Sequence, residues 1–222
     1  MTPQVLVGDV RRAAEQIIAK YPNPRSATLP LLFLVQSVEG FVTEQGMREV
    51  ADMLGLTSAQ VLSAGSFYTM LKKHRQGEYL ISVCRNVSCT HRGSRAVVQA
   101  FEERLGIGPG ETTPDGRFTL ETAECLATCD GAPSMQINYE DFYNVTAADV
   151  ADIVERLERG SPLPSSRGEL VKTSKEISYE TATVGLRSPG TAGDHTGRTL
   201  GGEALRPDTS PGTRPPELGT QQ

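Results

Sequence analysis

The chain has 222 residues, 37% of them hydrophobic and 22% charged, which is enough to bury a core in one medium domain or two small ones. A net charge of -5 and a pI near 5.3 argue against nucleic acid as a partner, because phosphate binding requires a concentrated basic surface. The longest apolar run, residues 29–35, is too short to cross a bilayer, and the first residues lack a signal-peptide pattern. We therefore expect a cytoplasmic protein, in which paired cysteines bind metal or carry out redox chemistry.

Apolar residues at helical spacing predict a bundle of short helices over residues 1–75. Asp9, Thr43 and Thr57 each stand where a side-chain oxygen could cap the start of a helix, and Gly40 stands where a helix would end. The expected helices span residues 10–20, 27–39, 44–54 and 58–71.

After the polar stretch 72–77, the helical spacing changes to the alternation of strands. The β-α-β-β-α order that follows predicts an α/β domain over residues 76–160, with one sheet flanked by helices, so the whole chain is of the α+β class. The expected elements are strands at 78–83 and 117–123, a hairpin of 134–138 with 142–145, and helices at 94–105 and 146–158, the last capped by Thr146.

The composition changes again after Gly160. Roughly a quarter of the later residues are Gly or Pro, and no periodic apolar face persists, so burial would not offset the entropy of ordering them. We expect residues 161–222 to form a disordered tail. Within it, residues 169–184 keep some apolar and β-branched content and could dock on a partner surface.

The four cysteines of the chain form two closely spaced pairs that leave none over. Cys84 and Cys89 follow one predicted strand, and Cys125 and Cys129 follow another. Two loops of this kind can close over one site with four thiolates. Spacing alone leaves three possibilities open: structural zinc, an iron-sulfur cluster or two disulfides.

The spacing favours an iron-sulfur cluster of the 2Fe-2S type over zinc, because each of its two irons needs two terminal thiolates. The chain lacks the close second gap of plant-type ferredoxins and the Cys-x-x-Cys of thioredoxins. Cys89-Thr-His91 resembles half of a Rieske box, but no histidine follows Cys125 or Cys129 closely. A tetrathiolate 2Fe-2S centre is therefore the preferred interpretation.

The residues around the cysteines resemble one known family, the 2Fe-2S subunit of the NADH-oxidising module of respiratory complex I, often called the 24 kDa subunit. The resemblance covers about residues 9–158. The motifs that carry it are Val83-Cys84 with Cys89 and Gly93, Leu105-Gly-Ile, Gly110-Glu-Thr-Thr, Asp115-Gly-x-Phe-Thr-Leu120, Glu124-Cys-Leu-x-x-Cys129, Ala132-Pro133 and Tyr143-Asn-Val-Thr146, with Tyr21-Pro, Arg25-Ser-Ala, Leu29-Pro-Leu-Leu, Val35-Gln36 and Phe67-Tyr-Thr-Met70 upstream.

The resemblance implies a thioredoxin-like fold and an electron-transfer role. It assigns one 2Fe-2S cluster to Cys84, Cys89, Cys125 and Cys129, with NADH and FMN bound only by a partner flavoprotein subunit. It further implies an NADH:quinone oxidoreductase of the respiratory chain, with the other peripheral-arm subunits as partners. The chain would then lie on the cytoplasmic side of the membrane without entering it, and would hold no complete active site of its own.

Two alternatives stay open. The same motifs occur in the diaphorase module of soluble NAD-dependent hydrogenases and formate dehydrogenases, and a zinc-stabilised scaffold without redox activity is a more distant possibility.

The chain also departs from the family pattern. Ala127 replaces a usual glycine, which costs about 1 kcal/mol or more if this position needs a positive φ. His91 replaces an apolar residue, and Gly65-Ser66 replaces Ala-Thr.

Two further groups of residues have an ordinary interpretation. Phe67, Tyr68 and Met70 are expected to pack in the bundle core or at an interface. Glu121 and Glu124 are expected to be solvated or interface carboxylates, because no nucleophile or paired histidine stands near them in the sequence.

Overall fold

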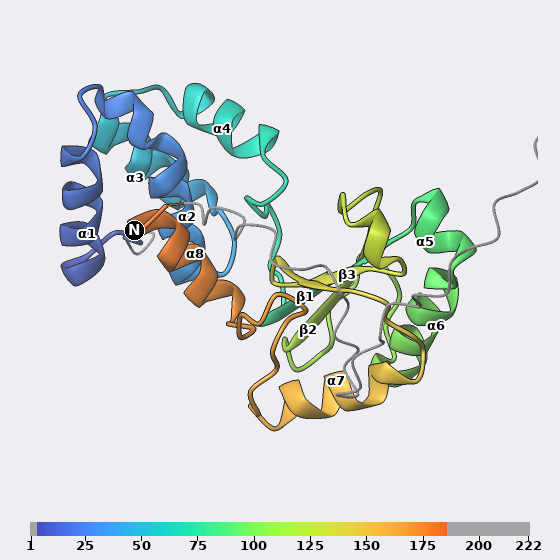
Figure 1. The fold of residues 1–222 in the computed structure, drawn as a ribbon. Coiled ribbons are helices and arrows are strands. Elements are labelled where there is room, and N and C mark those ends of the chain that lie inside the picture. The colour runs from blue at the N-terminus through green and yellow to red at the C-terminus, as the bar shows by residue number, and fades with distance from the viewer. Residues whose placement is uncertain (1–3, 186–222) are drawn as a thin grey trace, which may run out of the picture.

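The computed structural model describes residues 4–185. A helical bundle from the first part of the chain lies beside a mixed α/β part, and the chain returns to the bundle at its end (Figure 1). Each part has its own cluster of buried apolar side chains, one built mainly from residues 5–71 and the other from residues 79–163. The predicted α+β class is confirmed.

The bundle contains four α-helices and one short 3-10 helix, and most of the predicted starts and ends are confirmed. Thr43 and Thr57 cap their helices through side-chain oxygens, and Gly40 ends another in the left-handed conformation. Asp9 is not a cap, because Val7 takes that position and Asp9 pairs with Arg12 inside the first turn. The elements are α1 (Gly8–Ala19), η1 (Pro24–Ala27), α2 (Thr28–Glu39), α3 (Glu44–Leu54) and α4 (Ser58–Phe67).

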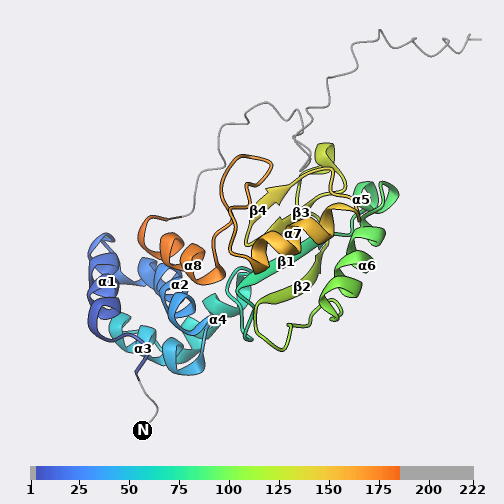
Figure 2. The same cartoon turned by 90° about the horizontal axis from the view of Figure 1, so that it is seen from below.

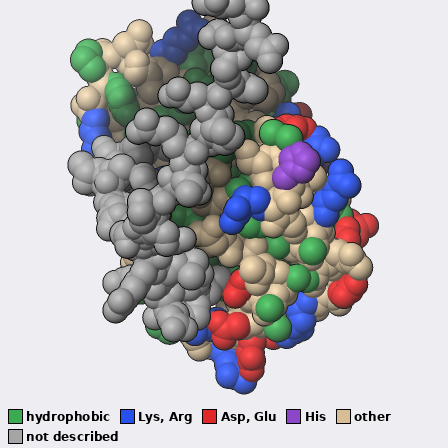
Figure 3. Space-filling model, turned by 45° about the vertical axis from the view of Figure 1, so that its right-hand side comes forward, with side chains coloured by type: hydrophobic (Ala, Val, Ile, Leu, Met, Phe, Trp, Pro, Cys, Tyr) green, Lys and Arg blue, Asp and Glu red, His purple; other side chains and the backbone are tan. Residues whose placement is uncertain are grey.

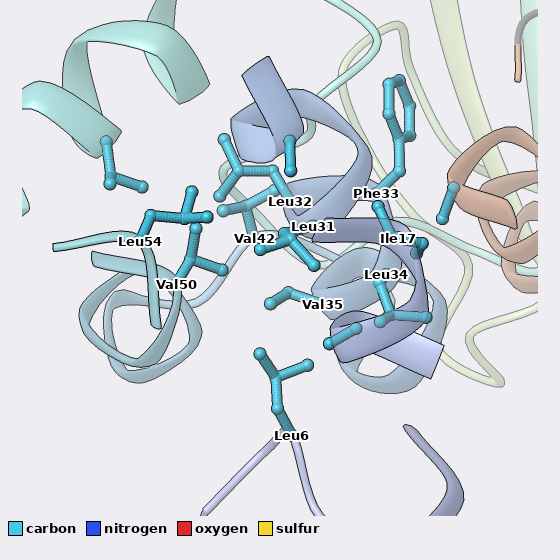
Figure 4. Close-up of a cluster of buried hydrophobic side chains, with 14 of the residues drawn as sticks. Leu6, Ile17, Leu31, Leu32, Phe33, Leu34, Val35, Val42, Val50 and Leu54 are labelled. Atoms are coloured by element: carbon cyan, nitrogen blue, oxygen red, sulfur yellow. The ribbon is translucent and has the colours of Figure 1, made fainter. Parts of the chain in front are cut away.

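Helix α2 is the centre of the bundle. Leu31, Leu32, Leu34 and Val35 are all fully buried, so the helix is covered on most of its circumference (Figure 4). A helix that is apolar all round requires neighbours on every side. In this protein the neighbours come from α1, η1, α3, α4 and residues 174–183.

The α/β part holds one four-stranded sheet with the order β2-β1-β3-β4. β1 and β2 are parallel, and the β1–β3 and β3–β4 pairs are antiparallel. Helices α6 and α7 pack against the sheet (Figure 2). The elements are β1 (Tyr79–Cys84), α5 (Val87–His91), α6 (Ser94–Leu105), β2 (Phe118–Ala123), η2 (Cys129–Gly131), β3 (Met135–Ile137), β4 (Glu140–Phe142) and α7 (Asp149–Glu158).

The predicted strands and helices of this part are present, with two local differences. The hairpin turns at Asn138 and Tyr139, which both have a positive φ, so the connection is tighter than the expected loop. Thr146 does not cap α7 at its first residue; its backbone N–H and its hydroxyl both donate to the carboxylate of Asp149.

The segment after α7 differs from the prediction of a disordered tail beginning at residue 161. Residues 161–185 fold, and α8 (Ser174–Thr183) packs along α2 (Figure 1). Leu163, Ile177 and Ala182 are buried, but they stand too far apart to form a periodic pattern in the sequence. Leu163 and Ala182 are buried because they pack against apolar side chains of other elements. The rest of the predicted tail, 186–222, lies outside the described residues.

One amide joins the bundle, the linker and the end of the chain. The Gln36 side chain in α2 donates to Ser178 Oγ at 3.0 Å and to the Met70 carbonyl at 3.1 Å, and its oxygen accepts the Lys72 N–H at 2.7 Å. The bond to Ser178 joins two buried side chains and is therefore shielded from water.

The predicted domain boundary at residue 75 falls between Leu71, in the first apolar cluster, and Tyr79, in the second. The division into separate domains stays a prediction. Within residues 4–185, no helix has the length and apolar character needed to span a membrane.

Candidate metal centre

The first cysteine loop is compact and mostly buried. Cys84 is the last residue of β1 and Cys89 lies in the short helix α5, with 2% and 1% of their surfaces exposed. Asn86 starts this helix, since its side chain accepts the Val87 N–H and its carbonyl accepts the Thr90 N–H. This one-turn helix was not predicted, because five residues are too few to show a helical period.

The second cysteine loop is exposed and irregular. Cys125 follows β2, and Cys129 begins η2. Ala127 between them has a φ of 58°, the positive φ at which an alanine side chain is strained, as anticipated from the replacement of glycine. In this conformation the Ala127 N–H donates a hydrogen bond to Cys125 Sγ at 3.4 Å.

The sheet brings the two loops to the same edge. β1 and β2 are parallel and in register at Cys84 and Ala123, so both strands deliver their loops at their carboxyl ends. The Arg85 N–H bonds to the Ala123 carbonyl at 2.8 Å, and the Arg85 side chain pairs with Glu124. All four thiols are free. The negative charge of Cys125 raises the pKa of Cys129, and the charge of Cys84 adds to the effect, so the sulfurs influence one another across the loops.

Ser134 connects the two loops. Its hydroxyl lies 3.5 Å from Cys89 Sγ of the first loop and accepts the Thr128 hydroxyl of the second at 2.8 Å. Its carbonyl accepts the Cys84 N–H at 3.1 Å. A single buried serine therefore holds the first pair of cysteines in place relative to the residue before Cys129. Nothing in the sequence marks it, since serine is a common residue in turns.

The segment after β4 supports the second loop from behind. The ring of Tyr143 lies so close to Gly131 that a Cβ on that glycine would be 2.6 Å from it. The Asn144 N–H donates to the Gly131 carbonyl at 2.7 Å, and the Val145 N–H donates to the Pro133 carbonyl at 3.0 Å. Glycine is required at residue 131 because the aromatic ring occupies the space of a side chain.

The donor set fits a 2Fe-2S cluster better than the alternatives. Structural zinc requires all four ligands around one ion, whereas a 2Fe-2S cluster requires two thiolates at each of two irons. No disulfide joins the four cysteines. Two pairs of sulfurs at one edge therefore match the two-iron case.

The other residues singled out in the sequence have structural roles. Glu121 accepts the Ser82 hydroxyl at 2.6 Å and pairs with Lys72, and Glu124 pairs with Arg85. His91 is exposed at the last turn of α5. On the described part of the face seen in Figure 3, basic and acidic side chains lie scattered among uncharged ones.

The aromatic pair at the end of α4 is not part of the bundle core. Phe67 is 79% exposed and Tyr68 is 46% exposed, although their rings contact each other edge to face. Met70 packs against the first apolar cluster. Of the two roles expected for the aromatic residues, the core role is wrong.

The model of one family, described as thioredoxin-like [2Fe-2S] ferredoxin, matches residues 14–158. The chain belongs to this family. One 2Fe-2S cluster, predicted from the resemblance, is thereby confirmed as the cofactor. The assignment of the four cysteines as its ligands stays a prediction.

Relatives of this ferredoxin confirm the resemblance to a complex I component. The E subunit of the NADH-quinone oxidoreductase of Mycobacterium tuberculosis (strain ATCC 25618 / H37Rv) is 44% identical over 155 residues, covering 70% of this chain and 62% of that protein. A second such protein, from Rhizobium meliloti, is 39% identical, covering 66% and 87%. NADH-quinone oxidoreductase subunit 2 of Thermus thermophilus is 38% identical, covering 67% and 84%. The chain thus spans about 62% of its mycobacterial relative.

A solved structure shows the same fold. A chain of the NAD+-reducing [NiFe]-hydrogenase in the air-oxidised state superposes with a TM-score of 0.57, covering 65% of this ferredoxin and 25% of that chain. With 22% sequence identity, this similarity concerns the fold alone.

Proposed function

We propose that this ferredoxin is the 24 kDa-type electron-transfer subunit of an NADH:quinone oxidoreductase, with its 2Fe-2S cluster held by Cys84, Cys89, Cys125 and Cys129. The names of its relatives support this function. The observation that carries the ligand assignment is the convergence of both cysteine pairs at the carboxyl ends of β1 and β2. When bound, the cluster accepts and releases single electrons.

The residues of the chain would bind the cluster, tune it and limit its access to water. The Ala127 N–H and the Ser134 hydroxyl lie beside Cys125 and Cys89, where hydrogen bonds to sulfur stabilise negative charge. The first pair is buried and the second exposed, so one side of the site is shielded and the other open to a partner. This asymmetry suits exchange of electrons across a protein interface.

The electron donor in this proposal is FMN on a partner flavoprotein subunit that also binds NADH. The sequence has no Gly-x-Gly-x-x-Gly after a strand and no phosphate loop, which supports placing both nucleotides on the partner. Through that complex the chain would lie at the cytoplasmic side of the membrane. A diaphorase component of a soluble hydrogenase or formate dehydrogenase is disfavoured by the names of the relatives that are 44% and 38% identical.

The ligand assignment is tested by anaerobic purification of the wild-type chain and the Cys125→Ser variant. We expect two irons and two sulfides per wild-type chain with a paramagnetic signal on reduction, and loss of iron in the variant, because an alkoxide is a poor substitute for a thiolate. Ser66→Ala, on the exposed side of α4, is the control and should keep its iron. One zinc without iron would refute the proposed redox function, and full iron with an unaltered signal in Cys125→Ser would remove that residue from the ligand set.

The assembly is tested with the tagged full chain. Purification from its own cells should recover a flavin-containing subunit together with quinone-reducing activity. Recovery of a hydrogenase or formate dehydrogenase subunit would replace complex I by the alternative.

A further inference from the structure

The chain beyond the family region contacts the outer edge of the sheet at β4. The family match ends at residue 158, and residues 163–167 then run along β4. The Ser166 N–H donates to the Asp141 carbonyl at 2.8 Å, and Ser166 Oγ accepts the Tyr143 N–H at 2.9 Å. Leu163 is buried in the core of the α/β part. This segment therefore covers the exposed edge of β4, which would otherwise present unpaired backbone groups.

Arg167 joins this segment to two side chains of β4 and its continuation. Its Nε lies 2.9 Å from Asp141 Oδ2 and donates to the Tyr143 hydroxyl at 3.0 Å. The Tyr143 hydroxyl in turn donates to Asp141 at 3.3 Å, and Gln136 donates to the same carboxylate at 2.8 Å. The Asp141 side chain is only 11% exposed, so Arg167 is the cation that compensates a mostly buried charge.

Tyr143 links Arg167 to the loop that carries Cys129. Its ring lies against Gly131, the last residue of η2, and Cys129 is the first residue of the same helix. The Asn144 N–H holds the Gly131 carbonyl at 2.7 Å. A shift of the Tyr143 ring would therefore displace the backbone that carries Cys129. The second loop has no helix of comparable length to α5 to resist such a shift.

We propose that Arg167 is a positioning residue for the 2Fe-2S cluster, acting through Tyr143 on the loop that carries Cys129. The proposal rests on the ligand assignment made above. Arg167 touches no ligand itself; it fixes the phenol ring that supports the loop. The segment after residue 158 is thus part of the cluster site.

The test uses the full chain, reconstituted anaerobically, with Arg167→Leu and Tyr143→Phe. Tyr143→Phe keeps the ring against Gly131 and removes only the hydroxyl that Arg167 holds. Both variants should bind a full complement of iron, show altered g values for the reduced cluster, and release iron to a chelator about tenfold faster, the effect expected for loss of a hydrogen bond to a charged group. Lys172→Leu removes an ion pair with Glu180 in the same segment and should match the wild type.

Unaltered g values and release rates in both variants would overturn the proposal, even if their melting temperatures fell. If Arg167→Leu does not fold, Tyr143→Phe decides alone, because it leaves packing intact. Arg167→Lys, which restores the charge beside Asp141, should recover part of the wild-type signal. Failure of the ligand assignment would appear separately, as full iron in Cys129→Ser.

Discussion

The two cysteine loops have the same task but owe their shapes to different parts of the chain. The first loop buries both of its cysteines and contains a short helix that Asn86, within the loop, caps, although Ser134 also contacts both cysteines. The second is exposed, contains a strained Ala127, and is held from outside by Ser134, Tyr143 and the segment after α7. The comparison teaches that half of the metal centre is encoded locally and half at a distance.

The difference in exposure also separates two functions of the site, shielding from water and access for a partner. Burial of Cys84 and Cys89 would keep water from one side of the cluster, whereas Cys125 and Cys129 lie where a partner can approach. The exposed cysteines Cys125 and Cys129 gain little rigidity from their own burial, so their loop depends also on hydrogen bonds and on the ring behind it. Changes to Tyr143 or Arg167 should therefore affect the second loop and spare the first.

The largest effect should come from ending the chain after residue 160. Removing buried Leu163 and Ile177 should lower the free energy of unfolding by about 3–6 kcal/mol, at roughly 1.5–3 kcal/mol for each fully buried side chain. The cluster should become labile because the Arg167–Tyr143 contact is lost as well. Denaturant unfolding and iron release measure both effects. A chain ending at residue 185 keeps every described contact and is the control, and a stable truncated chain with a normal cluster would contradict the distant support of the second loop.

Gly131→Ala should strike the second loop directly. The new methyl would lie 2.6 Å from the Tyr143 ring, and such overpacking costs roughly 1–3 kcal/mol. The expected result is a lower melting temperature of the apo chain and an altered spectrum of the reduced cluster. Gly108→Ala is the matched control, since its methyl would meet only the Glu111 carboxylate at an ordinary 3.5 Å. Equal behaviour of the two variants would show that the ring does not press on the loop.

Ala127→Gly should strengthen the second loop. Glycine adopts a φ of 58° without the steric cost that alanine bears, so we expect a gain of about 0.5–1 kcal/mol in unfolding free energy. The opposite sign is expected for Ala96→Gly in α6, because glycine weakens an exposed helix position by a similar amount. Thermal unfolding of the apo variants gives both values. A loss of stability in Ala127→Gly would mean that the alanine methyl contributes more to the folded loop than its strain costs.

The smallest effect should be a pH dependence of α8. Hydrogen bonds from the Thr173 hydroxyl and backbone N–H hold the pKa of Glu176 below its ordinary value of 4.5. Because the folded pKa is the lower one, this contribution is complete above the unfolded pKa and is lost as pH falls through the folded value. Hydrogen exchange in α8, corrected for intrinsic rates, should therefore accelerate below about pH 4.5 in the apo chain. Glu176→Gln should show no such pH dependence.

Much of the bundle could be predicted from the sequence because its signals are local. Thr43, Thr57 and Gly40 act within one turn of the helices that they begin or end. The cysteine pairs were informative for the same reason, since their spacing limits the chemistry, and the surrounding motifs identified the family. Ala127 was informative because it replaces a usual glycine, which indicated a strained position in the second loop.

The remainder could not be predicted, because it depends on contacts between distant residues. Ser134, Tyr143 and Arg167 are common residue types whose importance comes only from what the sheet places beside them. α8 was missed because its apolar residues are few and their burial surface is built by α2, far earlier in the chain. The sequence indicated some apolar and β-branched content over residues 169–184 but carried no information about the surface of this chain that receives it.

The bond between Gln36 and Ser178 joins residues 142 positions apart, and this has a consequence for synthesis of the protein. The chain is made from its N-terminus, so α2 leaves the ribosome long before α8 exists to cover it. The sheet and both cysteine loops are complete before the bundle is. Docking of α8 on α2 can therefore close the bundle only after the sheet and both cysteine loops have been synthesised.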